Sequence, residues 1–321
     1  MKKCYKIGLV GLGSIGIRHF HNILQVLKER STSCTIDLFR SGKGKEPDGE
    51  ISRHVNKIYN SYDEVVDNYD IIFITNPTNL HFETIKHFVN NTGHMFIEKP
   101  IFDKGDIALD ELKLKSSSVY YVACPLRYTG VIQYFKHKSD LSGTISVRAI
   151  CSSYLPDWRP NRDYREIYSA HKDQGGGVSI DLIHEWDYIC YLFGRPEKVL
   201  SIKGTFSRLE IDSEDLALYI AKYPNMTVEI HLDYFGRKTI RELQLFTDTD
   251  TIVGDIANNE IRYLNSGKTI SFMEDRDNIH IKELGHFFDI VEGKADNDSD
   301  AETALSVLRL AQGECYRESK E

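Results

Sequence analysis

Short apolar runs alternate with helix-like stretches over the first third of the chain. Short, mostly apolar segments occupy residues 5–11, 34–39, 70–75 and 95–97, of which 70–75 reads as a continuous apolar strand, and apolar residues recur at helical spacing over 16–30 and 80–90. A further short helix is expected to end at Val65 and Val66. Strands that are apolar throughout are buried on both faces, so this alternation predicts a parallel sheet covered by helices on each side.

Beyond about residue 122 the apolar segments are longer, and many alternate polar with apolar residues. They lie at 144–153, 199–207, 215–222, 226–234 and 239–247, and they predict a mainly antiparallel sheet with one exposed face. Helical spacing occurs apart from them at 178–193, 281–292 and 300–316. The whole pattern predicts an α/β protein with two domains, 1–122 and 123–321.

A glycine-rich turn joins the first predicted strand to the first predicted helix. It is Gly11-Leu12-Gly13-Ser14-Ile15-Gly16, the GxGxxG pattern of dinucleotide-binding Rossmann domains. Gly11 permits a tight turn, Gly13 lets the backbone approach a pyrophosphate, and Gly16 lets the helix pack on the strand. Ser14 and Ile15 begin the helix, whose N-terminus favours an anion. A turn without a ligand is the alternative interpretation.

The end of the second predicted strand bears on the choice between NAD and NADP. NAD sites carry an acidic residue there, about 20 residues after the loop. Arg40 occupies that position here, with Ser41 and Lys43 beside it, whereas Asp37 falls inside the strand. A guanidinium, a hydroxyl and an ammonium suit a 2′-phosphate, so we predict NADP(H), with NAD(H) as the alternative. A solvated basic loop would have the same composition.

Composition narrows the function class. The 321 residues suffice for two domains of about 100–200 residues each, and 41% hydrophobic and 27% charged residues are typical of a globular protein. A net charge of −8 disfavours a nucleic-acid partner, and no apolar run approaches the roughly 18 residues of a membrane span. Six cysteines without a CxxC pair, and histidines without metal-ligand spacing, lead us to expect reduced thiols, no metal and a cytoplasmic location.

Four motifs occur in an order that resembles one enzyme family. After the glycine loop come the segment 75–81 (Thr-Asn-Pro-Thr-Asn-Leu-His), then Glu98-Lys99-Pro100, then three glycines at 175–177 followed by Asp181 and His184. Together they are similar to the glucose–fructose oxidoreductase / inositol dehydrogenase / MocA family, over nearly the whole chain. The resemblance implies a Rossmann domain followed by an α/β domain with an open, mainly antiparallel sheet. It also implies NAD(P)-dependent oxidation or reduction of sugars, cyclitols and their derivatives.

The resemblance further implies roles for individual residues. Lys99 corresponds to the catalytic lysine, Arg127 to an arginine that reaches the cofactor, and Trp158-Arg159 to a loop that touches the cofactor in some members. The residues implied near the nicotinamide end of the cofactor are Thr75, Asn76, Pro77, Asn79, His81, Glu98 and Lys99. An ammonium at Lys99 can stabilise the alkoxide that forms as a hydroxyl loses its proton. Its bond to Pro100 is a candidate cis peptide, because cis bonds are mostly X-Pro bonds.

One departure from the family pattern affects the catalytic assignment. Many members carry the histidine four residues after the aspartate, whereas His184 is three after Asp181 and Glu185 is fourth. On a continuous helix both positions share a face with Asp181. We assign the proton acceptor to His184, because imidazole titrates near neutral pH, and Asp181 to positioning it or holding a substrate hydroxyl. Glu185 is left to orient His184, bind substrate or replace it, and a histidine simply packed against the sheet is the structural alternative.

Aromatic, basic and acidic residues crowd the segment 154–165, which also holds two prolines. Tyr154, Trp158 and Tyr164 can stack on a sugar ring, while Arg159 can bind hydroxyl, carboxylate or phosphate groups. The segment therefore suits a polar sugar, including an acidic or nucleotide-linked one. A loop at an oligomer interface is the equal alternative.

The function predicted from these features is hydride transfer between a nicotinamide cofactor and a CH–OH group of a sugar, cyclitol or sugar derivative. One alternative is a catalytically silent cofactor-binding sensor or regulator. Another is an enzyme that uses bound NAD transiently for elimination or glycosidic cleavage. We expect a small-molecule partner, neither nucleic acid nor membrane, and a homodimer or homotetramer.

Overall fold

The computed structural model describes residues 4–42, 46–47, 49–64, 68–137, 139–275 and 277–313. The chain forms two compact units: Met1–Ala123 with His280–Leu305, and Cys124–Ile279 with Ser306–Glu321. The segment 280–305 thus groups with the first unit although it follows most of the second unit in the sequence. The predicted domain boundary after residue 122 stays a prediction.

The first unit is built on a parallel sheet. Its described strands, in the order β3-β2-β1-β4-β5-β6, all run parallel to their neighbours. The strands are β1 (Cys4–Val10), β2 (Ser33–Phe39), β3 (Val55–Tyr59), β4 (Tyr69–Ile74), β5 (Thr92–Ile97) and β6 (Tyr120–Val122). The helices are α1 (Ser14–Glu29), α2 (Gly49–His54), α3 (His81–Phe88) and most of α7 (Asn278–Val291), while α8 (Ala301–Gln312) begins in this unit.

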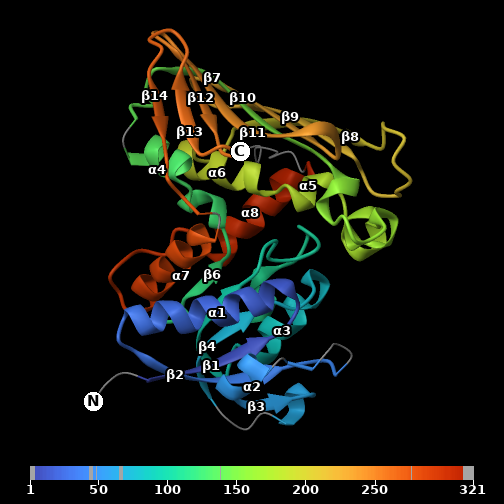
Figure 1. Cartoon of the computed structure of the whole chain (residues 1–321), viewed down its shortest axis with the longest axis vertical. Coiled ribbons are helices and arrows are strands. Elements are labelled where there is room, and N and C mark those ends of the chain that lie inside the picture. Colours follow the sequence, from blue (N-terminus) through green and yellow to red (C-terminus); the bar gives the residue numbers. More distant parts are fainter. Residues whose placement is uncertain are drawn as a thin grey trace, which may run out of the picture. The chain divides into compact units, whose positions relative to one another are not determined.

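The strand order contains a topological switch point between β1 and β4. From β1 the chain moves outward through β2 and β3, and from β4 it moves in the opposite direction through β5 and β6. Because parallel crossovers are right-handed, α1 and α3 cover opposite faces of the sheet (Figure 1). Ligands of such sheets bind outside the carboxyl ends of the strands at the switch point.

Aromatic side chains fill both sides of this sheet. Phe73, Phe96 and Tyr121 stand opposite one another on β4, β5 and β6, and Phe287 of α7 packs against all three. On the other side, Phe39 contacts Tyr59, Tyr69 and Phe88 of α3. Helix α7 therefore supplies core to the first unit, which explains its grouping with residues far earlier in the chain.

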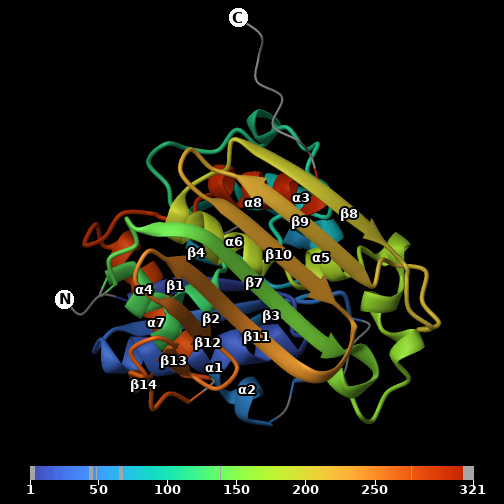
Figure 2. The same cartoon turned by 90° about the horizontal axis from the view of Figure 1, so that it is seen from above.

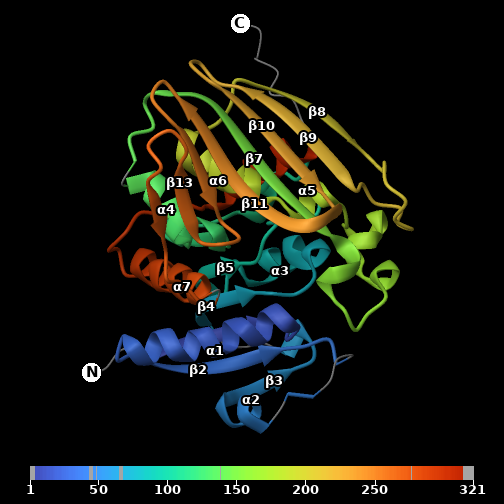
Figure 3. The ribbon, with the colours of Figure 1, turned by 45° about the horizontal axis from the view of Figure 1, so that its top comes forward.

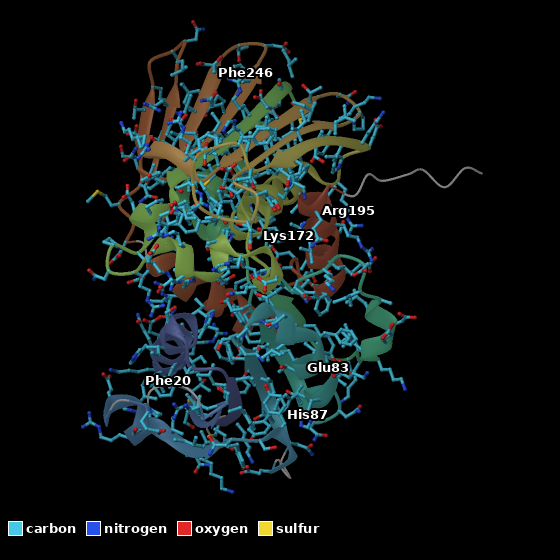
Figure 4. The ribbon with its side chains drawn as sticks, turned by 90° about the vertical axis from the view of Figure 1, so that its right-hand side faces the viewer. Phe20, Glu83, His87, Lys172, Arg195 and Phe246 are labelled. Carbon is cyan, nitrogen blue, oxygen red and sulfur yellow. The ribbon has the colours of Figure 1, made fainter. Side chains whose placement is uncertain are left out.

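Helix α1 shows how the apolar pattern positions an element. Phe20, Ile23, Val26 and Leu27 are all buried, and Phe20 is labelled on this helix in Figure 4, with the exposed Glu83 and the partly exposed His87 on α3. Since these apolar residues recur at three- and four-residue intervals, one face of α1 packs on the sheet. This holds the first turn of α1 directly after the glycine loop.

The second unit is built on a larger sheet, seen face-on in Figure 2. The described strands lie in the order β14-β13-β12-β11-β7-β10-β9-β8, and every neighbouring pair is antiparallel except β7 with β10. The strands are β7 (Thr144–Tyr154), β8 (Lys198–Gly204), β9 (Leu216–Lys222), β10 (Thr227–Asp233), β11 (Phe235–Thr247), β12 (Thr251–Asp255), β13 (Glu260–Tyr263) and β14 (Thr269–Ser271). With the first unit, this confirms the predicted α/β fold class.

Helices cover one face of the second sheet. Helix α4 (Gly130–His137) contacts β12 and β13, α5 (Val178–Asp181) contacts β9 and β10, and α6 (His184–Phe193) contacts β7 (Figure 3). On β9 and β10, buried residues alternate with more exposed ones. The other face of the sheet therefore carries the more exposed residues, as the sequence pattern predicted.

The structure corrects several predicted elements. The helix expected over 178–193 is two helices, because the backbone leaves helical geometry at Leu182 (φ −99°, ψ 32°). Strands β3, β6, β12, β13 and β14 are too short to stand out in the apolar pattern and were not predicted. The predicted helix end at 65–66 and the end of the last helix at 314–316 lie outside the described residues. No helix of the described residues has the length and apolar character to cross a membrane.

Candidate functional site

The glycine loop follows β1 and opens α1, and its three glycines have different surroundings. Gly11 has φ +94°, and a Cβ there would lie 2.9 Å from the backbone of Asn76. A Cβ on Gly16 would overlap the carbonyl oxygen of Gly11, whereas one on Gly13 would meet no atom within 4 Å. Gly11 and Gly16 are therefore required by the turn itself. At Gly13 the backbone borders open space.

The N-terminus of α1 has the features of an anion site. Gly13 is the N-cap, so no side chain caps the helix, and no acidic residue lies in the first turn. The first backbone N–H groups and the positive end of the helix dipole therefore meet the open space beside Gly13. These groups fit the pyrophosphate of a dinucleotide, with Gly13, Ser14 and Ile15 as its backbone contacts.

Three predicted segments meet at the carboxyl edge of the parallel sheet. The first residue after each of three neighbouring strands donates its backbone N–H to the last residue of the next strand: Gly11 to Phe39, Thr75 to Val10 and Glu98 to Ile74, each at 2.9 Å. Thr75 Oγ1 also donates to the carbonyls of Val10 and Gly11, at 2.9 and 3.0 Å. The glycine loop, the segment 75–81 and Glu98-Lys99 thus lie side by side at the switch point.

The Glu98 carboxylate is held between α1 and the backbone of Lys99. His19 Nε2 donates to Glu98 Oε1 at 2.5 Å, and the Lys99 N–H donates to Glu98 Oε2 at 3.2 Å. Burial by itself raises the pKa of Glu98, but the hydrogen bond and charge of His19 and the charges of Lys99 and His280 outweigh it and leave the pKa below its usual value. Glu98 therefore stays ionised and fixes the start of the segment that carries Lys99.

Lys99 is half-buried and is the second residue after β5. The Lys99–Pro100 peptide bond is cis, as predicted. The charge of Lys99 acts on Glu98, so its ammonium lies within electrostatic range of the strand ends that carry the glycine loop. The catalytic role of Lys99 stays a prediction.

Two residues of the segment 75–81 serve the fold of the first unit. The buried His81 ring lies between the carbonyls of Ile101 (3.1 Å) and Asn76 (3.0 Å), and burial lowers its pKa. Asn76 Nδ2 donates to Thr84 Oγ1 at 2.9 Å. Pro77 and Asn79 are exposed. Among the cofactor contacts predicted in this segment, Pro77 and Asn79 are thus the ones open to a ligand.

Arg40 stands at the end of β2, as predicted from the sequence. Its guanidinium, largely shielded, pairs with the exposed Glu46 at 2.9 Å. Asp37 is buried inside β2 and accepts hydrogen bonds from Asn56 and Tyr69, each at 2.8 Å. Its carboxylate therefore serves the fold. Ser41 is exposed, and Lys43 lies outside the described residues.

The break between α5 and α6 separates Asp181 from the next two predicted site residues. Asp181 ends α5 and His184 begins α6, so the geometry of one continuous helix does not apply. Glu185 is fully buried, and its Oε1 accepts from Arg241 Nε of β11 at 2.8 Å. His184 is only partly buried. The ion pair places Glu185 in the core under the sheet, whereas His184 stays accessible.

Asp181 is held by a tyrosine from the sheet. Tyr234, which follows β10, donates from its hydroxyl to Asp181 Oδ2 at 2.6 Å, and both residues are buried. The charge of Asp181 also acts on the Tyr168 hydroxyl. Burial and the charge of Asp181 raise the pKa of both tyrosine hydroxyls above its usual value, so both stay protonated.

The triple glycine allows the backbone to approach this cluster closely. A Cβ on Gly176 would overlap the carbonyl of Tyr168, and one on Gly177 (φ +134°) would lie 2.7 Å from the Glu214 carboxylate. Ser179 Oγ donates to that carboxylate at 2.5 Å. These contacts tie the start of α5, and hence Asp181, to the segments 168–171 and 205–215.

The predicted sugar-binding loop is only partly assembled around Asp181. Trp158 packs edge-on against Tyr234, with ring centroids 5.2 Å apart, and donates from Nε1 to Ser153 Oγ at 2.9 Å. The charge of Arg159 acts on the Tyr168 hydroxyl. Tyr154 instead stacks with Arg237, whose guanidinium lies 3.9 Å from the ring centroid. The hydroxyl of Tyr164 accepts the backbone N–H of Glu210 at 3.2 Å.

Comparison with known proteins agrees with the motifs of the first unit. Residues 5–117 match the family model described as "Oxidoreductase family, NAD-binding Rossmann fold" (Gfo/Idh/MocA). The match contains both the glycine loop and the Glu98-Lys99-Pro100 motif. Residues 5–117 therefore resemble the Rossmann domain of this family. The expected resemblance is therefore confirmed.

The individual proteins that the chain resembles have low sequence identity to it. The chain is 28% identical to a 2,7-anhydro-N-acetylneuraminate hydratase of Escherichia coli over 62% of this chain and 53% of that protein. It is 24% identical to a myo-inositol 2-dehydrogenase of Thermotoga maritima over 62% and 58%. The chain thus spans little more than half the length of these relatives. A levoglucosan dehydrogenase in complex with NADH and levoglucosan has the same fold, with a TM-score of 0.80, 17% identity and coverage of 96% of each chain.

Arg127 has a partner inside the second unit. Its guanidinium is 2% exposed and forms a two-point ion pair with Asp187, at 2.9 and 2.6 Å, over the ring of Tyr191. The pair joins the turn before α4 to α6 inside the second unit. The ion pair gives Arg127 a structural role, and its contact with the cofactor stays a prediction.

Sequence reasoning missed two residues of these clusters, His19 and Tyr234. His19 had one usable signal, because it lies among the buried positions of the amphipathic α1. A polar residue on an apolar face usually has a buried partner. Among the described residues, no group of three or more His, Cys, Asp or Glu is arranged to hold a metal ion.

Proposed function

We propose that this protein is an NAD(P)-dependent dehydrogenase or reductase that acts on a CH–OH group of a sugar, cyclitol or sugar derivative. The observation that carries the proposal is the carboxyl edge of the parallel sheet. There the uncapped N-terminus of α1 borders open space at Gly13, and Lys99 lies just after β5, two strands away from β1 in the sheet. The match of residues 5–117 to an NAD-binding oxidoreductase family supports that chemistry.

The bound cofactor supplies a nicotinamide ring that can accept or donate a hydride. The protein itself binds the cofactor and the substrate, and it transfers the hydroxyl proton. Backbone N–H groups of Gly13, Ser14 and Ile15 bind the pyrophosphate, and the Lys99 ammonium stabilises negative charge on the reacting oxygen. His184 accepts or returns the hydroxyl proton, and Asp181 holds a second hydroxyl of the substrate.

We favour His184 over Glu185 as the proton acceptor. Glu185 is paired with Arg241 in the core, and protonating its carboxylate would leave the partly buried guanidinium without its counter-charge. An imidazole exchanges protons near neutral pH, which suits a proton acceptor. The partial exposure of His184 supports the same choice.

For the cofactor we propose a preference for NADP(H) within an NAD-binding family. Asp37 is buried and hydrogen-bonded, so it offers no free carboxylate to a ribose 2′-hydroxyl. Arg40 follows β2 and pairs with Glu46 on the exposed loop. A 2′-phosphate competes with Glu46 for that guanidinium, since both are anions that bind an arginine fork.

A second function is favoured by one of the comparisons. The Escherichia coli relative is a hydratase, not a dehydrogenase by name. The corresponding chemistry here is addition or loss of water, with transient oxidation by bound NAD acidifying the neighbouring C–H. The same lysine and histidine would serve as acid and base. In that case NAD(P)H does not accumulate while substrate is consumed.

We also propose that two copies of the chain associate through the exposed face of the second sheet, in a cytoplasmic protein with reduced thiols. Leu200 faces Ile220 and Ile202 faces Leu218 across β8 and β9, and Leu200, Ile202 and Ile220 are 59%, 62% and 50% exposed. A contiguous aliphatic block of this kind is typical of an interface. Sedimentation of Ile202→Lys tests it: dissociation is expected, and an unchanged mass contradicts the interface.

A dehydrogenase screen tests the main proposal. Wild type and Lys99→Ala are incubated with NAD or NADP and a panel of sugars, cyclitols and sugar acids, while NAD(P)H absorbance and substrate loss are both recorded. Absorbance that rises with wild type and not with Lys99→Ala is expected. Substrate loss without a rise identifies the hydratase-type function, and cofactor binding without either identifies a silent sensor. Full activity of Lys99→Ala removes this lysine from the mechanism.

A further inference from the structure

Arg241 of β11 uses only one nitrogen of its guanidinium in its ion pair. Its Nε donates to Oε1 of Glu185 at 2.8 Å. Among the residues that the structure describes, Glu185 provides the only oxygen that accepts a hydrogen bond from this side chain. The Cys151 thiol, directly opposite Arg241 on β7, is a weak acceptor. The Nη1 and Nη2 groups therefore carry donors that no strong acceptor of the described chain occupies.

These donors remain accessible. The side chain of Arg241 is 22% exposed, whereas that of Glu185 is completely buried. Neither Nη group of Arg241 is among the buried polar atoms that lack a hydrogen-bond partner in the described part of the chain. Since the Nε edge is covered by the buried carboxylate, the exposed part of the guanidinium is the edge formed by its Nη groups. That edge is open to a ligand.

A guanidinium can bind two carboxylates at once, and another arginine of this chain does so. Arg165 donates from Nε and Nη2 to Asp163, at 2.9 and 2.7 Å, and from Nη1 to Glu210 at 2.7 Å. Its five N–H donors allow this, because each acid takes a different edge of the planar group. Arg241 has one acid, Glu185, and so has room for a second acid that a ligand supplies.

Arg241 lies at the same end of the second sheet as the residues around Asp181. Arg241 is paired in register with Cys151 of β7, and Ser153, two residues further along β7, accepts from Trp158 Nε1 at 2.9 Å. Residues two apart on a strand share a face and are about 7 Å apart. Trp158 in turn packs on the tyrosine whose hydroxyl binds Asp181. A chain of contacts within the second unit therefore connects the open guanidinium edge to the Asp181 cluster.

We propose that Arg241 is a specificity-determining residue that selects acidic sugars: its Nη groups bind the carboxylate of a substrate whose ring lies against Asp181. The inference rests on the proposed function and names the substrate class of the same site. A carboxylate is planar and takes two charge-assisted hydrogen bonds from one edge of a guanidinium. A neutral sugar with a hydroxymethyl group at that position forms weaker bonds, so Arg241 discriminates between the two.

The test compares a sugar acid with its neutral counterpart in the full-length protein loaded with NADPH or NADH. Methyl glucuronide and methyl glucoside have the same locked ring and differ only at C6, which is a carboxylate in the first and a hydroxymethyl group in the second. The reduced cofactor cannot accept a hydride, so isothermal titration calorimetry measures binding without oxidation. Dissociation constants are determined for wild type, Arg241→Gln, Glu185→Gln and the variant with both substitutions, and urea denaturation verifies that each is folded.

Two comparisons separate ligand binding from a structural role. Arg241→Gln and Glu185→Gln break the same ion pair, but Glu185→Gln keeps the guanidinium and removes its competing acid. The variant with both substitutions leaves neither charge without its partner, so it replaces Arg241→Gln if the single variant does not fold. Arg148→Gln is the matched control, because Arg148 Nε also donates to a carboxylate, that of Glu229 at 3.0 Å, and both side chains are exposed (44% and 43%).

We expect wild type and Arg148→Gln to bind methyl glucuronide at least tenfold more tightly than methyl glucoside. Arg241→Gln, alone or with Glu185→Gln, is expected to reduce this preference below threefold and to leave the affinity for methyl glucoside within threefold of wild type. Glu185→Gln should keep or strengthen the preference. Equal losses of preference in Glu185→Gln and Arg241→Gln, or a wild type without preference, overturn the inference and leave the dehydrogenase proposal standing. Wild type that binds the cofactor and neither glycoside overturns the inference together with the proposed substrate class.

Discussion

The imidazole of His19 donates from Nε2 to the Glu98 carboxylate at 2.5 Å, across 79 positions of sequence. Both residues are shielded from solvent, with side-chain exposures of 1% and 13%. The bond joins the helix that follows the glycine loop to the residue before Lys99. It therefore links the proposed phosphate site to the proposed catalytic lysine within the first unit.

Replacing His19 by Gln is expected to lower kcat about tenfold, because a small displacement of a catalytic group is costly. It should also lower the free energy of unfolding by about 1–3 kcal/mol, the cost of a buried acceptor that loses its donor. Steady-state kinetics and urea denaturation measure the two effects. His21→Gln is the control, since His21 lies on the same helix and its ring packs against Phe20. Equal kcat values for the two variants contradict the positioning role.

Two glycines of the loop should have different roles, Gly13 in cofactor binding and Gly16 in folding. Gly13 has ordinary extended geometry (φ −77°, ψ −171°) with open space beside it, so Gly13→Ala should fold like wild type. The added methyl group occupies the pyrophosphate position, and we expect affinity for NAD(P)H to fall about tenfold or more, about 1.4 kcal/mol.

Gly16→Ala should behave in the opposite way, because its Cβ overlaps the Gly11 carbonyl. We expect a loss of about 1–3 kcal/mol in unfolding free energy from overpacking. Thermal melting and fluorescence titration with NADPH and NADH, applied to both glycine variants, distinguish the effects. Unchanged cofactor affinity in Gly13→Ala would falsify the assignment of this space to a pyrophosphate.

Cofactor preference should depend on Arg40 and its partner Glu46. Arg40→Asp is expected to weaken NADPH binding about tenfold to a hundredfold, the loss of one or two charge-assisted hydrogen bonds, and to affect NADH little. Glu46→Gln releases the guanidinium and should tighten NADPH binding. The ratio of the NADPH and NADH dissociation constants measures the effect. An Arg40→Asp variant with the wild-type ratio refutes the 2′-phosphate site.

Glu185 and His184 are neighbours in sequence, but their substitution should have different consequences. Glu185→Gln leaves the Arg241 charge buried without its partner, and we expect a loss of about 3–5 kcal/mol of stability. His184→Gln should change stability by less than about 1 kcal/mol, with a fall in kcat of about a hundredfold or more from loss of the proton acceptor. Urea denaturation and steady-state kinetics on both variants provide the measurement. A His184→Gln variant with the wild-type kcat would show that another group is the proton acceptor.

An ion-pair cluster between α1 and α7 predicts an acid-dependent part of stability. Burial raises the pKa of Glu292, but hydrogen bonds from Lys294 and Arg30 and their charges bring it down to about 2. Because the folded-state pKa is depressed, this stabilisation is present above the unfolded-state value of about 4.3 and is lost as the pH falls toward 2.

Glu292→Gln should therefore be less stable than wild type by about 0.5–1 kcal/mol at pH 7, and the difference should vanish in acid. Urea denaturation from pH 7 to pH 3 checks this. A difference between wild type and Glu292→Gln that stays constant with pH would show that Glu292 acts through packing and not through its charge.

The sequence alone predicted those features that depend on near neighbours in the chain. The continuous apolar runs before Gly11, Thr75 and Glu98 identify buried parallel strands, because each residue's burial follows from the period of its own segment. The glycine loop is equally local, since Gly11 and Gly16 are required by the turn that they form. Lys99 and Asp181 were identified as candidates by motifs of a few adjacent residues.

Tertiary structure decided which of these residues have partners. The spacing of apolar residues continues through Leu182 and Ile183, so no periodicity reveals the break that separates Asp181 from His184. Glu185 and Arg127 could not be assigned to the core until Arg241 and Asp187 were seen to neutralise them. The bonds of His19 to Glu98 and of Tyr234 to Asp181 join positions 79 and 53 residues apart. A single sequence records periodicity along the chain, whereas the order and register of the strands bring such distant groups within hydrogen-bonding distance.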